Sequence, residues 1–297
     1  MNTTSYQQIG AKSVDRVHHT IWGVRLATMA QLGIPLSHMP HTTLNERLGI
    51  YESGRFTDKD KLRTFWYCIG NNGVNIVAGP EEIYTNEPVD YDPRTPVAYN
   101  PMPFVLRRLN DDLTDTEREN YRLRRKENHN GVDYWAYYAK KFDIEKVVRV
   151  LIERTENGTT VPSEYTTTSD LLYPKKPVVS PRRVEKTSNE KIFVSCPASI
   201  IFTEQDVQEF YEVCRIKYNS TAPAIVSEIG LIMGVDERYR SPVDGIQYQE
   251  LKCATVATLL NSLHDLNYNP DGFVEQLSVG DKAPLLTMST LTPTIGG

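Results

Sequence analysis

Proline places the strongest constraint on this chain, through a span that runs from residue 79 to residue 103. Each proline fixes φ and removes a backbone donor, so this span is predicted to be neither a regular helix nor a central strand. Three tyrosines within it, a residue type enriched at interfaces, are predicted contact residues: Tyr84, Tyr91 and Tyr99. A second span, 166–189, carries Pro174, Pro177 and Pro181 and is predicted to be a linker or arm.

Outside these spans the sequence favours antiparallel hairpins. Residues 64–69 and 74–77 are β-prone and flank a turn over 70–73, where Asn and Gly tolerate positive φ. A second hairpin is predicted from 121–126 and 132–140 around the turn 128–131, with basic side chains on its exposed face. A third is predicted from 147–153 and 159–165.

The C-terminal region is predicted to contain two helices. The first follows Thr203, whose hydroxyl and Asp206 form a capping-box-like start, and apolar residues recur with helical spacing to Tyr218. A buried strand is expected over 224–233. The second helix is expected over 248–266, with Leu251, Leu259 and Leu266 on one side. For residues 13–31 the pattern fits either one helix or two short strands.

The fold class is therefore predicted as α+β, with antiparallel hairpins, two C-terminal helices and long extended proline-rich arms. Five segments are expected: 1–80, an N-terminal region with a hairpin; 81–165, an extended arm plus an antiparallel β region; 166–190, a linker; 191–285, an α+β domain; and 286–297, a tail.

Composition and charge argue against several classes of protein. A net charge of -5 argues against a protein that coats nucleic acid. The polar N-terminus lacks the features of a signal peptide, and no apolar run reaches the length of a membrane helix, so neither secretion nor membrane contact is expected. The four cysteines lack Cys-x-x-Cys spacing and are predicted to be buried, reduced thiols: Cys68, Cys196, Cys214 and Cys253.

No motif in the sequence predicts an enzyme or a cofactor. His38 and His41 could contribute to a metal-dependent hydrolase, but Pro40 breaks the helical spacing that would align them, so surface histidines are the preferred interpretation. Nucleotide-binding glycine motifs do not occur. The basic run from Arg122 to Lys126 and the pair Arg182 and Arg183 could contact DNA in a channel. Because acidic residues such as Asp112 lie nearby, salt bridges within or between subunits are preferred.

The extended, aromatic spans favour an assembly. A lone subunit would have nothing to offset the lost conformational entropy of such arms, whereas subunits in a closed ring can clasp their neighbours. The predicted interface residues are Tyr84, Tyr91, Tyr99, Phe104, Arg107, Arg122, Arg124, Arg125, Arg182 and Arg183.

Three stretches carry a resemblance to structural proteins of tailed bacteriophages, including N4-like phages. They are residues 103–113 leading into 117–124; residues 137–143 followed by the turn 156–158; and residues 224–231 ending in 234–236. Over residues 80–285 the chain is similar to such virion proteins. The resemblance implies a non-enzymatic component of a homo-oligomeric ring at the head–tail connector, neck, tail or baseplate. Its expected partners are copies of itself and other virion proteins, in a virion built in the host cytoplasm.

Overall fold

The computed structural model describes residues 17–39, 43–78, 84–92, 94–156, 159–166, 169, 173 and 190–284. The chain divides into two compact units. The larger comprises residues 3–143 and 199–276, and the smaller comprises residues 1–2, 144–198 and 277–297. The five predicted segments stay a prediction.

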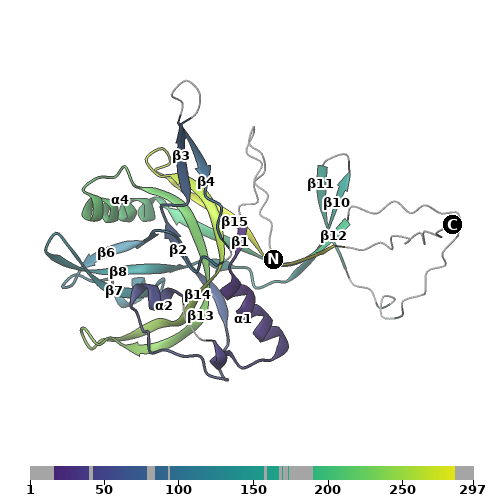
Figure 1. The fold of residues 1–297 in the computed structure, drawn as a ribbon, viewed down its shortest axis with the longest axis horizontal. Helices are drawn as coiled ribbons and strands as arrows, with labels where there is room; N and C mark the ends of the chain where they lie inside the picture. Colours follow the sequence, from purple (N-terminus) through teal and green to yellow (C-terminus); the bar gives the residue numbers. More distant parts are fainter. Residues whose placement is uncertain are drawn as a thin grey trace, which may run out of the picture. The chain divides into compact units, whose positions relative to one another are not determined.

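The larger unit is built on an antiparallel sheet of eight described strands, which differ in length. Their order is β1-β14-β13-β2-β8-β6, with β5 also paired to β2 and β7 to β8. The long hairpin of β13 and β14 runs through the unit as its spine (Figure 1). The strands are β1 (Val17–His19), β2 (Arg63–Gly70), β5 (Pro101–Met102), β6 (Val105–Arg108), β7 (Tyr121–His129), β8 (Val132–Lys141), β13 (Ile225–Arg240) and β14 (Gln247–Asp265).

A second sheet has the order β11-β10-β12-β15, with β9 also paired to β12. Its strands are β9 (Asp143–Ile144), β10 (Arg149–Glu156), β11 (Thr159–Glu164), β12 (Glu190–Thr203) and β15 (Gly272–Pro284). The boundary between the units falls within β12 and β15. A separate two-stranded sheet pairs β3 (Val74–Ala78) with β4 (Tyr84–Pro88). The described helices are α1 (Ile21–Leu32), the 3-10 turn η1 (Leu36–His38), α2 (Thr43–Leu48), α3 (Asp115–Arg118) and α4 (Glu204–Tyr218).

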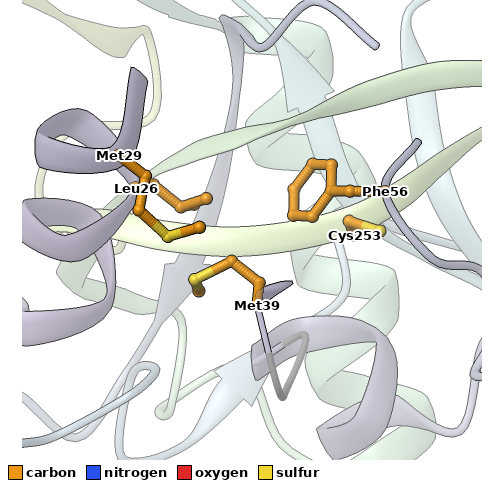
Figure 2. Packing of buried hydrophobic residues seen from close by; sticks show 5 residues of the cluster. All are labelled: Leu26, Met29, Met39, Phe56 and Cys253. Atoms are coloured by element: carbon orange, nitrogen blue, oxygen red, sulfur yellow. The ribbon is translucent and has the colours of Figure 1, made fainter. Parts of the chain in front are cut away.

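Helix α1 packs one face onto β14. Thr20 caps its N-terminus by accepting a hydrogen bond from the Gly23 amide, and Gly33 ends it in the left-handed conformation. Leu26 and Met29 point from this helix into an apolar cluster with Met39, Phe56 and Cys253 (Figure 2). The described part of the range 13–31, for which the pattern fits either one helix or two short strands, thus contains one short strand followed by one helix.

Gly23 allows this close packing, and Gly23→Ala tests it. A Cβ here would overlap the backbone of Ala257, with its carbonyl oxygen only 2.6 Å away. We expect Gly23→Ala to lower the free energy of unfolding by about 2 kcal/mol, because the strand must shift. Propensity alone would make the change stabilising by about 1 kcal/mol. Urea unfolding shows whether Gly23→Ala lowers or raises the free energy of unfolding. Ala27→Gly, in the same helix, is the control that measures helix propensity.

The α+β class, rich in strands, is confirmed, and so is the predicted start of α4. Thr203 and Asp206 form the full capping box. The second predicted helix is wrong, because residues 247–265 form strand β14. Its residues are buried almost continuously from Glu250 to Ser262. A strand covered on both faces shows no alternation of apolar and polar residues, and a helical period can be picked out of such a run by chance.

The predicted hairpins have different outcomes. The second and third are confirmed as β7–β8 and β10–β11. In the second, Asn130 and Gly131 have φ of 53° and 80°, as a tight two-residue turn requires. In the first, both strands form but do not pair with each other: β2 pairs with β13, β8 and β5, while β3 pairs with β4.

The first proline-rich span is not an arm in its described part. It contributes β4 and β5, and Tyr91, Val97, Ala98 and Met102 are buried within the same unit. The prediction of an arm is therefore wrong for residues 91–92 and 94–103, because the buried side chains among them fix this part of the span to its own unit. The second span, 166–189, lies outside the described residues except at 166, 169 and 173.

Candidate functional site

Two of the three arginines of β7, Arg122 and Arg124, lie inside the larger unit rather than on its surface. Arg122 is 7% exposed and Arg124 is 3% exposed. The prediction that basic side chains of this hairpin face solvent is wrong for both. Leu123, between them, has a φ of 58° and its amide bonds to the Glu250 carboxylate rather than to β8. This irregularity breaks the alternation of inward-facing and outward-facing side chains along β7.

Arg124 is held by two carboxylates and an aromatic ring. Its Nη2 donates to Asp112 and Asp244, each at 2.7 Å. The guanidinium carbon lies 3.5 Å from the centre of the Trp135 ring, a cation–π distance. Burial acts to lower the pKa of Arg124, but the hydrogen bond to Asp244 and the charge of Asp112 outweigh it and leave that pKa raised. The predicted salt bridging with nearby acids is confirmed within the chain for Arg124 and Asp112.

A pocket of about 460 Å³ opens beside this network. Arg118, Arg122 and Arg238 line it together with Asp115 and Glu119. Arg122 Nε donates to Asp236 at 2.9 Å, and its Nη1 donates to three backbone carbonyls of residues 118, 119 and 121. Since two of the three guanidiniums are already bonded to this chain, the lining carries no clear surplus of positive charge for an anion. We interpret the network as a scaffold that fixes α3 and β7 to the spine hairpin.

Two fully buried glutamates of the β13–β14 hairpin have the same structural role, which is to accept hydrogen bonds from backbone amides. Glu228, on β13, accepts hydrogen bonds from the Tyr91 hydroxyl and from the amides of Asn72, Tyr99 and Asn100. Glu250, on β14, accepts bonds from the amides of Leu123, Arg124 and Leu251. Each carboxylate thereby supplies acceptors to backbone groups that no neighbouring strand reaches.

A third buried carboxylate, Glu127, connects β7 with β8 and α4. It accepts a hydrogen bond from the Tyr138 hydroxyl and pairs with Arg125 at 2.8 Å and Lys217 at 3.6 Å. His129 lies 2.8 Å away. Burial acts to raise the pKa of Glu127, but the Tyr138 hydrogen bond and the two cations outweigh it and leave that pKa lowered.

This shift predicts a pH-dependent contribution to stability. A carboxyl with a lowered folded pKa stabilises the fold above its ordinary pKa of 4.5, and the contribution is lost as the pH falls through the folded value. We expect Glu127→Gln to lower the free energy of unfolding by about 2 kcal/mol at pH 7. The difference from wild type should shrink below about pH 4. Urea unfolding at both pH values measures it, and a difference that does not change with pH would contradict this role for the charge.

The other predicted interface residues divide into three groups. Tyr91 and Phe104 are buried within the chain, so as interface residues they are wrong, like Arg122 and Arg124. Tyr99 is exposed and stacks on Tyr91 at 5.2 Å. The Arg107 guanidinium donates two hydrogen bonds to the Glu209 carboxylate, and Arg125 donates one to the Leu48 carbonyl. Arg182 and Arg183 lie outside the described residues. Tyr84 lies in a described strand, but its side chain is outside the described side chains.

The histidines and cysteines are the remaining residues that could bind a metal or react. His38 is exposed in η1, and His41 lies outside the described residues. Within the described ranges, no group of three or more metal-ligating side chains occurs. The cysteines are free, with Cys196 partly exposed and Cys68, Cys214 and Cys253 buried. In the same ranges, every helix is too short or too polar to cross a membrane.

Sequence reasoning missed one exposed surface, on the outer face of α1. Ile21, Val24 and Leu32 are 46%, 49% and 67% exposed, and Ile34 follows just beyond the helix. Arg25 is the only charged residue in the helix. The signal was available: Thr20 before the helix and Gly33 after it are capping residues, and the apolar residues between them occur on both faces.

Comparisons with known proteins give a family and no named relative. A model of a family of unknown function, DUF7208, matches residues 6–294. Neither the curated proteins nor the solved structures contain a match to the chain.

Proposed function

This chain belongs to DUF7208, a family described as one of unknown function, and we propose that it is a non-enzymatic structural component of a tailed-phage virion. In this proposal, copies assemble into a ring at the head–tail connector, neck, tail or baseplate, together with other virion proteins. The proposal starts from the resemblance to phage structural proteins of three stretches: residues 103–113 with 117–124, residues 137–143 with 156–158, and residues 224–231 with 234–236.

The observation that carries the proposal is the uncovered apolar stripe of α1. Ile21, Val24 and Leu32 recur with helical spacing and face away from the core that Leu26 and Met29 enter. A surface helix of a lone soluble domain normally carries charged and polar residues on this side, whereas here Arg25, Thr28 and Gln31 share it with three large apolar side chains. Apolar residues gathered on an exposed face mark an interaction site.

The buried charges of the larger unit support a scaffolding role. The oxygens of Glu228 and Glu250 are occupied by backbone amides, and Arg124 is occupied by Asp112 and Asp244. These groups hold connecting segments onto the β13–β14 hairpin. Their arrangement suits a rigid building block that keeps its shape on assembly.

The test is the mass and location of the protein. We expect light scattering coupled to size-exclusion chromatography to give a mass several times that of the chain. Electron microscopy should show rings, and mass spectrometry should find the chain in purified virions. A protein that stays monomeric at all concentrations and is missing from virions would refute the proposal.

A further inference from the structure

Three Asn–Gly sequences occur in the chain, at residues 72–73, 130–131 and 157–158. An asparagine that precedes glycine is prone to lose its side-chain amide, because glycine has no side chain to hinder the attack of its own nitrogen. The third pair lies outside the described residues. The structure distinguishes the other two pairs, which the sequence alone leaves equivalent.

The first pair is enclosed and held by hydrogen bonds. The Gly73 amide donates to Ser227 Oγ at 2.8 Å, and the Gly73 carbonyl accepts from the Val89 amide at 2.9 Å. The Asn72 amide donates to the Glu228 carboxylate at 3.1 Å. A Cβ atom added to Gly73 would lie 2.5 Å from the Ser227 carbonyl oxygen. The backbone at this pair can therefore change its conformation only if several buried contacts break.

The second pair forms the open tip of the β7–β8 hairpin. Asn130 and Gly131 are both exposed, and a Cβ atom added to Gly131 would meet nothing within 4 Å. The Gly131 amide donates to the exposed side chain of Asn128 at 3.2 Å. Exposed loop tips open locally at a lower free energy than buried segments. The Gly131 nitrogen is therefore far easier to release than the Gly73 nitrogen.

We infer that Asn130 is a site of spontaneous covalent modification, at which the side-chain amide is lost. A base in the solvent removes the proton of the Gly131 amide, and this nitrogen attacks the side-chain carbonyl carbon of Asn130. A carbon–nitrogen bond forms, ammonia leaves, and a cyclic imide results. Water then opens the imide at either carbonyl and gives aspartate or isoaspartate, without oxidation or reduction. The reaction needs only water and does not depend on the proposed function.

The product alters the hairpin tip itself. Isoaspartate carries the main chain through the former side chain and so lengthens a two-residue turn. The φ values of that turn, 53° at Asn130 and 80° at Gly131, suit asparagine and glycine. Either product also adds a negative charge. The modified protein is therefore more acidic, and in the isoaspartyl form the tip of the β7–β8 hairpin is loosened.

Incubation in mildly alkaline buffer, followed by peptide mass spectrometry, tests the inference. In the folded protein, we expect Asn130 to be converted about 10-fold faster than Asn72, or more, because less structure must open. In urea the enclosure of Gly73 is lost, so the two rates should become similar. An Asn130 that is not converted in the folded protein, or is converted no faster than Asn72, would overturn the inference.

Two variants test the structural cause, and each is the control for the other. Asn128→Ala removes the acceptor of the Gly131 amide, so it should speed conversion of Asn130 a few-fold and leave Asn72 unchanged. Ser227→Ala removes the acceptor of the Gly73 amide, so it should speed conversion of Asn72 and leave Asn130 unchanged. Unchanged rates in both variants would contradict this explanation of the difference between the two sites.

Discussion

Replacing Glu228 with alanine is expected to lower the free energy of unfolding by about 3–5 kcal/mol. The side chain is fully buried, and its two oxygens accept four hydrogen bonds. Alanine would leave the Tyr91 hydroxyl and three backbone amides without an acceptor in the interior. Because small domains have only about 5–15 kcal/mol in total, this change should be visible as a large drop in the urea midpoint.

Two further variants sharpen this result. Glu228→Gln keeps the size and one acceptor oxygen, so its loss should be smaller than that of alanine. Glu119→Ala, at an exposed position, should change the midpoint little. Hydrogen exchange should show the amides of Asn72, Tyr99 and Asn100 losing protection first in Glu228→Ala. A midpoint for Glu228→Ala equal to that of the exposed control would contradict the role of this carboxylate.

Glu250→Ala is expected to have an effect of similar size, about 3–5 kcal/mol, at the other end of the spine. Its carboxylate accepts the Leu123 amide at 2.6 Å, the Leu251 amide at 2.7 Å and the Arg124 amide at 3.0 Å. Without it, the irregular point of β7 loses its attachment to β14. Urea unfolding measures the loss, and Gln249→Ala, at the exposed neighbour on the same strand, is the control.

The pH dependence of Glu250 has the opposite sign to that of Glu127. Burial raises the pKa of Glu250, although three amides and the charge of Arg122 act to lower it. A group with a raised folded pKa is penalised as an anion, so its contribution improves as the pH falls toward the folded value. The Glu250→Ala loss should therefore be at least as large at pH 5 as at pH 7. A loss that disappears at pH 5 would show that the anion is needed.

Glu228 helps to explain why the first predicted hairpin is wrong. The chain around Asn71 to Gly73 has the residue types of a tight turn, and two strands flank it. Glu228 and Ser227 bind the amides of Asn72 and Gly73, and β2 pairs with β13 while β3 pairs with β4. Glu228 and Ser227 lie 156 and 154 residues from the groups they bind, and β13 is similarly distant from β2, so no local pattern indicates them.

The same reasoning applies to the candidate interface. Aromatic and arginine residues are frequent at interfaces, yet Tyr91, Phe104 and Arg124 are equally suited to a buried network. Their burial depends on Glu228, Asp244 and Trp135, which approach only in the folded unit. The exposed stripe of α1 was within reach of sequence reasoning, since it needs only the helical period and the caps.

The sequence by itself determined the features that depend on near neighbours along the chain. These are the strand-rich α+β class, the capping box of α4 at Thr203 and Asp206, and the turn at Asn130 and Gly131. The tertiary structure alone decided that residues 247–265 are a strand and that the described part of the first proline-rich span packs on its own unit. The reason is that caps and turns are set by local backbone geometry, whereas strand pairing and burial depend on contacts between distant residues.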